Sequence, residues 1–214
     1  MVVFIINYNR LTLPRNIADW CHAHGLEPVI VDNNSNYPLL LEYYEECPYQ
    51  VIMLERNYGH KCIWDLGLID ELEIKDRYII TDPDLDLSGV PDDFLDVMSK
   101  GLDKYPSYDK CGLSLEINDL PDSDEGRFIR SNCEAGYWTK PLDPLYFHAD
   151  TDTTFALYRE NSREYNYNAI RTNRPYTARH IPWYYTDFNL LPEDEQYYFN
   201  SASRSSSGKK RLFK

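Results

Sequence analysis

The chain has few basic residues for its acidity, no paired cysteine spacing and no long apolar run. Its 22 lysine and arginine residues stand against 35 aspartate and glutamate residues, which gives a net charge of -13. A surface of that sign repels nucleic acid and anionic lipid. No segment approaches the ~20 consecutive apolar residues of a membrane-spanning helix. The sequence therefore predicts neither a nucleic-acid partner nor a membrane span.

The cysteines give no sign of a disulfide framework. Their number is odd and none belongs to a C-x-x-C pair, so we expect reduced thiols in the core. They are Cys21, Cys47, Cys62, Cys111 and Cys133. Met1 is followed directly by Val-Val-Phe-Ile-Ile, without a basic leader and with an apolar run too short for a signal peptide. We therefore expect a cytoplasmic protein.

The length and the composition of the last residues predict the domain organisation. The chain of 214 residues is long enough to bury roughly 70% of its unfolded surface in one domain. From Ser201 onward the composition changes to small polar and basic residues, which is typical of a flexible linker. We expect a domain over residues 1–200, with residues 201–214 either a linker to a missing domain or a disordered tail.

Strand and helix patterns alternate four times in the first part of the chain. Short apolar runs predict strands at residues 2–6, 28–31, 50–54 and 78–81, and apolar stripes predict helices at 12–24, 39–44 and 63–72. Thr12 is expected to cap the first helix and Gly25 to end it. Such alternation predicts an α/β fold with a mainly parallel central sheet and helices on both faces. Ligands in such sheets bind beyond the carboxyl ends of the strands.

The second half of the chain is less regular. A helix is expected at residues 94–102, and strands at 111–117 and 153–158. Residues 119–150 are rich in proline, aspartate, glycine and aromatic residues, without clear periodicity. Long irregular segments inside compact domains are usually binding loops, so a second binding region is expected there.

Polar residues follow each of the four predicted strands. Turn formation alone explains any single one of these loops, because Asn, Asp and Gly favour turns whatever the function. Their coincidence at four strand ends nevertheless predicts one polar rim. Its residues are Asn7, Tyr8, Asn9, Arg10, Asp32, Asn33, Asn34, Arg56, Asn57, Tyr58, Gly59, Asp82, Asp84 and Asp86.

Three carboxylates, Asp82, Asp84 and Asp86, follow the fourth strand at alternate positions. Acids at i and i+2 past a strand can face one hard cation, and oxygen ligands suit Mg²⁺ or Mn²⁺ held together with substrate phosphates. A calcium loop would need glycine where Leu87 stands. A phosphatase with an aspartyl nucleophile has Asp-x-Asp after its first strand, followed by Thr or Val at the place of Asp86. The third interpretation is the Asp-x-Asp motif of nucleotide-sugar glycosyltransferases.

On these motifs the chain resembles the GT-A fold family of nucleotide-sugar glycosyltransferases over most of residues 1–200. Within that family it is similar to glycosyltransferase domains that begin multidomain proteins of large chlorella viruses. For a viral protein, the resemblance implies host cytoplasm and further domains of the same polypeptide. It also implies a GT-A type α/β fold with a smaller irregular acceptor-side region. The matching segments are Asn7-Tyr-Asn9-Arg10, Val31-Asp32-Asn-Asn-Ser35, Arg56-Asn57-Tyr-Gly59-His60, Thr81-Asp82-Pro-Asp84 and Asp152-Thr-Thr-Phe-Ala-Leu-Tyr158.

The resemblance implies a Mn²⁺-dependent or Mg²⁺-dependent enzyme that moves a hexose or deoxyhexose from a UDP-sugar to a glycan acceptor. Asp84 would be the principal metal ligand, Asp82 would contact the metal or the ribose, and His180 would complete the metal shell. An imidazole ligand favours Mn²⁺ over Mg²⁺. Asp32 would accept from the uracil N–H. The remaining nucleotide contacts would come from Asn7, Asn9, Arg10, Arg56, Asn57 and Lys61.

The implied sugar-binding and catalytic residues are Asp150 and Asp152, with Trp138 as an aromatic wall. An inverting enzyme needs a carboxylate base, for which Glu116 and Asp119 are further candidates. The resemblance at His180 slightly favours retention over inversion. The alternative function is a non-catalytic module that binds a nucleotide-sugar within a larger protein.

Overall fold

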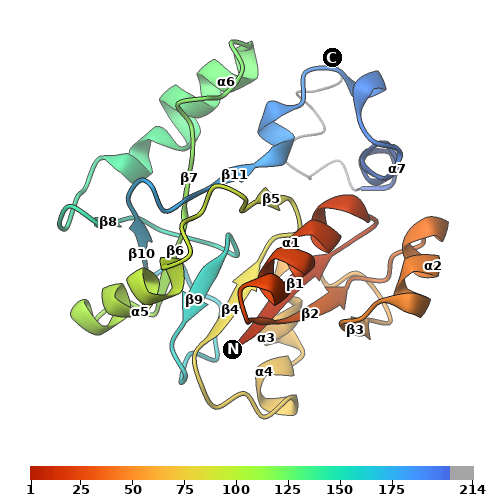
Figure 1. Ribbon diagram of the computed structural model, residues 1–214, viewed down its shortest axis with the longest axis horizontal. Coiled ribbons are helices and arrows are strands. Elements are labelled where there is room, and N and C mark those ends of the chain that lie inside the picture. Colours follow the sequence, from red (N-terminus) through yellow and green to blue (C-terminus); the bar gives the residue numbers. More distant parts are fainter. Residues whose placement is uncertain (203–214) are drawn as a thin grey trace.

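The computed structural model describes residues 1–202, which form an α/β fold around one large sheet (Figure 1). The eight strands of this sheet lie in the order β3-β2-β1-β4-β9-β6-β10-β8. Their bounds are β1 Val2–Asn7, β2 Glu27–Asp32, β3 Gln50–Met53, β4 Tyr78–Thr81, β6 Lys110–Gly112, β8 Tyr146–His148, β9 Ala156–Tyr158 and β10 Ala169–Thr172.

The sheet is mixed, so the prediction of a mainly parallel sheet is not confirmed. β3, β2, β1 and β4 are parallel neighbours, and β6 is parallel to β10. β9 runs antiparallel between β4 and β6, and β8 runs antiparallel to β10 at the edge. Antiparallel neighbours need no crossover helix. The regular alternation of strand and helix accordingly predicts only the part of the sheet up to β4.

A second, small sheet lies beside the end of β4. It contains β5 (Leu85–Asp86), β11 (Thr177–His180) and β7 (Ser114–Leu115), with β11 in the middle. The single strand predicted at residues 111–117 is therefore wrong, because its two halves, β6 and β7, belong to different sheets. In β11, His180 lies opposite Leu85, and this pairing brings His180 close to the carboxylate segment.

The helices cover both faces of the large sheet. Their bounds are α1 Thr12–Ala23, α2 Pro38–Glu46, α3 Cys62–Asp65, α4 Leu68–Glu71, α5 Phe94–Lys104, α6 Asp124–Phe128 and α7 Glu193–Ser201. The helix predicted at residues 63–72 is two short helices, because Gly67 adopts a left-handed φ of 64° between them. The segment predicted to be irregular contains α6 and β8. Short 3₁₀ or π turns span Gly59–Lys61, Ile129–Cys133, Ala135–Trp138, Ile181–Tyr184 and Phe188–Leu190.

The core has two parts, one on each face of the sheet. Alternate residues of a strand point to opposite faces. Val3 and Ile5 of β1 pack with α1 and α5, whereas Phe4 and Ile6 pack with α3 and α4. All five cysteines are free thiols. Cys21, Cys62 and Cys111 are buried, as predicted. Cys47 is half-buried and Cys133 is exposed.

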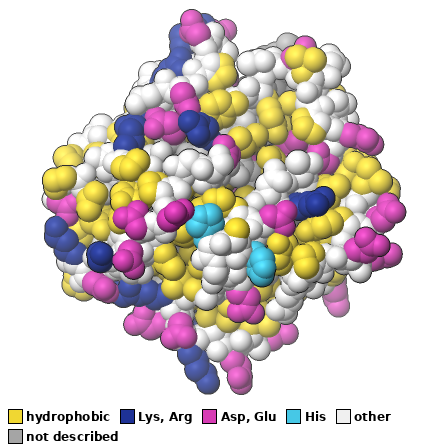
Figure 2. All heavy atoms as spheres, viewed as in Figure 1, with side chains coloured by type: hydrophobic (Ala, Val, Ile, Leu, Met, Phe, Trp, Pro, Cys, Tyr) yellow, Lys and Arg dark blue, Asp and Glu magenta, His cyan; other side chains and the backbone are white. Residues whose placement is uncertain are grey.

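Two further predictions concern a membrane span and the linker at the end of the chain. Figure 2 shows acidic side chains spread over one face, with basic side chains among them. No helix within residues 1–202 has the length and apolarity to cross a membrane. Of the predicted linker at 201–214, Ser201 ends α7, and residues 203–214 lie outside the described part of the chain.

Candidate functional site

The carboxyl ends of β1, β2 and β4 lie side by side at one edge of the large sheet, and the polar residues there form a rim. Asn7 ends β1 and lies opposite Asp32, which ends β2. Asp82 follows β4 directly, and Asp84 immediately precedes β5. The parallel pairing of the three strands places these polar side chains at one edge of the sheet, as the sequence predicts.

Asp84 is a buried carboxylate of this rim, with 8% of its surface exposed. Its Oδ2 accepts a hydrogen bond from Arg10 Nη1, and His180 Nε2 lies 3.5 Å from the same oxygen. Burial opposes ionisation, but His180 and the Arg10 guanidinium hold the pKa of Asp84 below its ordinary value. Asp84 Oδ1 and His180 Nδ1 are buried and have no hydrogen-bond partner within the described chain.

Arg10 is a buried cation between two acids. Its Nε lies 3.0 Å from Glu195 Oε1, and its guanidinium carbon lies 3.8 Å from the centre of the Tyr198 ring. Burial raises the pKa of Glu195 to about 7, although Arg10 acts in the opposite direction. Glu195 and Tyr198 both belong to α7. This helix therefore holds the Arg10 guanidinium beside Asp84.

α7 is tied to the loop that precedes α1. Asp194 Oδ2 accepts hydrogen bonds from the backbone N–H groups of Leu11, at 3.0 Å, and Thr12, at 2.6 Å. Asn9 Nδ2 donates to Ser201 Oγ at 3.0 Å. The prediction that Thr12 caps the first helix is wrong, because Thr12 is the first helical residue and Asp194 satisfies the exposed N–H groups instead.

Asp82 is a partly exposed carboxylate held by two hydroxyl groups. Its Oδ1 accepts from Thr153 Oγ1 at 2.5 Å, and its Oδ2 lies 3.4 Å from Thr154 Oγ1. Burial, Asp152 and Asp84 raise the pKa of Asp82 to about 8. Within residues 1–202 no three metal-binding side chains cluster tightly enough to form a complete metal site. Asp84 and His180 form a pair, with Asp82 beside them.

We expect Asp82→Asn to raise the free energy of unfolding at pH 8 by up to about 5 kcal/mol. With a folded pKa of about 8 and an ordinary value of 3.8, Asp82 binds a proton in the folded protein that it lacks when unfolded. Its contribution to stability is present at low pH and is lost as the pH rises through this window. Asparagine needs no proton, so the gain should vanish near pH 4. Urea denaturation at both pH values measures the gain, and equal gains would contradict the prediction.

Asp150 and Asp152 are exposed. A buried lysine holds the backbone of the segment that leads from Asp152 to β9. Lys110 Nζ donates to the carbonyl oxygens of Asp152 and Asn166, both at 2.7 Å, and to the Tyr158 hydroxyl at 3.0 Å. Lys110 is fully buried, and burial lowers its pKa to about 8. Its three donors are thus all used to position the loop that carries Asp152.

The predicted uridine residues shape their own loops. Asp32 is fully buried and accepts from Ser35 N and Oγ, both at 2.6 Å, and from the Tyr44 hydroxyl at 2.8 Å. Asn7 Nδ2 donates to the carbonyl of Arg10 at 2.8 Å, whereas Asn7 Oδ1 is buried and has no hydrogen-bond partner among the described residues. The Asp32 carboxylate therefore serves the turn after β2 in this structure, which is the alternative role that its residue type suggests.

Three further predicted nucleotide residues lie after β3 and make local contacts. Asn57 Oδ1 accepts from Gly59 N at 2.8 Å, and the Arg56 guanidinium carbon lies 4.6 Å from the centre of the Tyr58 ring. Lys61 Nζ lies 4.6 Å from the centre of the Tyr165 ring. Arg56, Asn57 and Lys61 are exposed, and within the described chain no hydrogen bond or ion pair joins them to Asp84.

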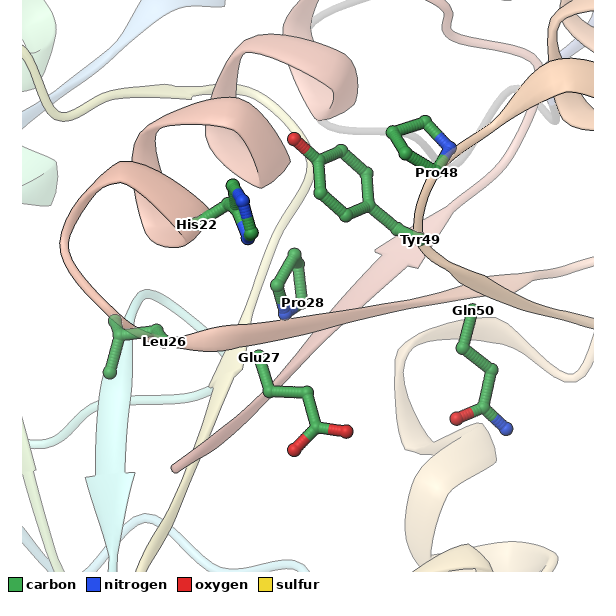
Figure 3. Close-up of a pocket in the computed structure, with 7 residues that line it drawn as sticks. All are labelled: His22, Leu26, Glu27, Pro28, Pro48, Tyr49 and Gln50. Atoms are coloured by element: carbon green, nitrogen blue, oxygen red, sulfur yellow. The ribbon is translucent and has the colours of Figure 1, made fainter.

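Two cavities lie away from the carboxylates. One of about 440 Å³ opens at the start of β2 and β3, at the opposite ends of these strands from the rim (Figure 3). Its lining residues are His22, Leu26, Glu27, Pro28, Pro48, Tyr49 and Gln50. The other, of about 180 Å³, lies beside Asp150. Neither is lined by Asp82 or Asp84.

Sequence reasoning missed Glu195, Tyr198 and Lys110. The acidic run Glu193-Asp194-Glu195 before the basic tail was an available signal, but nothing in it indicates contact with Arg10. Lys110 stands directly before an apolar strand and reads as an exposed strand end. The contacts of these three residues are with residues distant in the sequence, so no local pattern predicts them.

Comparison of the sequence with protein-family models and with curated proteins gave no match. The geometry of the rim and the motifs of the sequence therefore carry the functional argument.

Proposed function

We propose that the chain is a metal-dependent glycosyltransferase of GT-A type, which moves a hexose or deoxyhexose from a UDP-sugar to a glycan acceptor. The observation that carries the proposal is Asp84, an enclosed carboxylate after a parallel strand that already stabilises a cationic group. Within residues 1–202 its second oxygen has no hydrogen-bond partner. Ligands of parallel strands bind at this end of the sheet, and a cation held there attracts a diphosphate.

The donors around Asp84 fit a divalent ion, provided that Arg10 moves. Asp84 supplies a carboxylate, and His180, whose pKa burial lowers, supplies a neutral imidazole. Mn²⁺ accepts both donor types, and such ions use one or two protein carboxylates together with substrate phosphates. Asp82 is the second carboxylate. When bound, the ion would stabilise the charge that develops on the departing diphosphate.

The residues around the carboxylates have separate roles in this proposal. Thr153 and Thr154 orient Asp82, and Lys110 positions the backbone of Asp152. The exposed Asp152 carboxylate is the group that would take a proton from an acceptor hydroxyl in an inverting reaction. A retaining reaction, which we slightly favour from the resemblance at His180, leaves Asp152 to bind the sugar.

The second candidate is a non-catalytic nucleotide-sugar-binding module. The ion pair between Arg10 and Asp84 favours it, because the rim already contains its own cation. Such a module would bind UDP with or without a divalent ion and would transfer no sugar. Detection of sugar transfer to any acceptor removes this candidate.

The direct test is UDP release from a panel of UDP-hexoses and UDP-deoxyhexoses by the full chain. We expect release that requires Mn²⁺ and stops when the ion is chelated. Calorimetry with UDP should also show binding that Mn²⁺ strengthens, because the ion bridges protein and diphosphate. Release that persists after chelation, or no UDP binding in the presence of Mn²⁺, would refute the proposal.

A further inference from the structure

The small cavity beside Asp150 lies between the turn Ala135–Trp138 and β8. It has a volume of about 180 Å³, and its lining residues are Gly136, Tyr137, Lys140, His148, Ala149 and Asp150. We propose that this cavity binds the acceptor as a neutral, hydroxyl-rich sugar ring. The role of this sugar as an acceptor rests on the proposed function. The affinity of the cavity for a sugar does not depend on it.

The polar groups of the cavity are available to a ligand. Neither the Lys140 ammonium nor the Asp150 carboxylate forms a hydrogen bond or ion pair within the described chain. His148 uses Nδ1 for the Tyr108 hydroxyl at 2.9 Å, which leaves Nε2. Sugar hydroxyls both donate and accept, so they satisfy a cation and a carboxylate together. The opposite charges of Lys140 and Asp150 favour a neutral ligand over a phosphate.

A buried ion pair lies behind two lining residues of the cavity, Tyr137 and Asp150. Arg171 and Glu134 are 4% and 5% exposed, and Arg171 Nη1 donates to Glu134 Oε1. Arg171 Nε donates to the carbonyl of Asp150 at 2.7 Å, and its guanidinium carbon lies 4.1 Å from the centre of the Tyr137 ring. Arg171 therefore fixes both Tyr137 and the Asp150 backbone. The guanidinium covers one face of the Tyr137 ring, so it is the opposite face that would meet the apolar side of a sugar.

Asp152 connects the cavity to the carboxylates of the rim. Thr154 Oγ1 lies 2.9 Å from Asp152 Oδ1 and 3.4 Å from Asp82 Oδ2, so one hydroxyl joins the two acids. On the other side, burial raises the pKa of Glu134, and the charge of Asp152 adds to the rise. Asp152 thus lies near Asp82 on one side and near Glu134, the partner of Arg171, on the other. A sugar in the cavity would present a hydroxyl toward Asp152, with the donor on the Asp82 side.

Backbone amide NMR of the full chain tests the inference with two separate probes. The first is a panel of methyl glycosides of common hexoses, deoxyhexoses and pentoses, and the second is UDP with Mg²⁺, which avoids paramagnetic broadening. We expect at least one glycoside to shift the amides of Gly136, Tyr137, Ala149 and Asp150. UDP should instead shift amides near Arg10 and Asp84. If no glycoside shifts the cavity amides, the inference is wrong, whatever UDP does.

Lys140→Met supplies the matched variant, with the exposed Lys75→Met as its control. Losing one hydrogen bond from a charged group should weaken binding of the glycoside about tenfold. UDP release in the absence of acceptor should be unchanged, because Lys140 does not reach the rim. A Lys140→Met variant that binds the glycoside normally, or that loses affinity for the UDP-sugar, would overturn the assignment. Glycoside binding without UDP binding would leave the cavity a sugar site and refute only the proposed function.

Discussion

Asp84→Asn should lower Mn²⁺-dependent UDP release by about 10²-fold to 10³-fold or more. Asparagine keeps the shape of the side chain but lacks the charge that holds a divalent ion, and it leaves Arg10 paired with Glu195 alone. The loss should appear in kcat at saturating UDP-sugar, because the ion would act on the departing diphosphate. UDP release under steady-state conditions measures it.

The matched control for this variant is Asp86→Asn. Asp86 is the third carboxylate of the same segment, but it is half-buried on β5 and its Oδ1 accepts from Ser88 N at 2.9 Å. We expect this variant to keep wild-type activity. Thermal unfolding of both variants shows whether either change acts through folding. A folded Asp84→Asn variant with full activity would exclude Asp84 as the ion-binding group.

Arg10→Met should lower the free energy of unfolding of the metal-free protein by about 3 to 5 kcal/mol. Within residues 1–202, Arg10 is the only arginine or lysine that forms an ion pair with Asp84 or Glu195. The other basic group near Asp84 is His180, which carries a charge only when protonated. The buried Asp84 and Glu195 carboxylates then both lose the guanidinium that neutralises them. Urea denaturation without divalent ions measures the loss, and Arg15→Met, which breaks an exposed pair on α1, provides the control.

The same variant separates an ion site from a purely structural ion pair. If a divalent ion binds where Arg10 now lies, Mn²⁺ should stabilise Arg10→Met more than it stabilises the wild type, because the ion no longer competes with the guanidinium. Stabilisation should grow with the Mn²⁺ concentration, as expected for a ligand that binds only the folded state. An Arg10→Met variant that Mn²⁺ stabilises no more than the wild type would argue for a structural role alone.

Local patterns in the sequence predicted the first half of the fold well. Periodicities of two and 3.6 residues identify β1 to β4, α1 and α2 because the signals lie within each segment. The prediction failed at Gly67, where a left-handed residue breaks a helix, and at residues 111–117, where the chain leaves one sheet for another. The choice of strand partner depends on the whole sheet, which explains the unconfirmed parallel arrangement after β4.

The sequence by itself determined that acids follow β4 and that polar residues end the neighbouring parallel strands. Only the tertiary structure decided which groups meet there. Arg10, His180 and Glu195 come from three distant parts of the chain, and they converge on Asp84 because α7 packs against the loop before α1 and β11 pairs with β5. Charge pairing acts through space, at distances of a few ångströms, and has no period along a sequence. Spacing could therefore locate the carboxylates but not the cation that accompanies them.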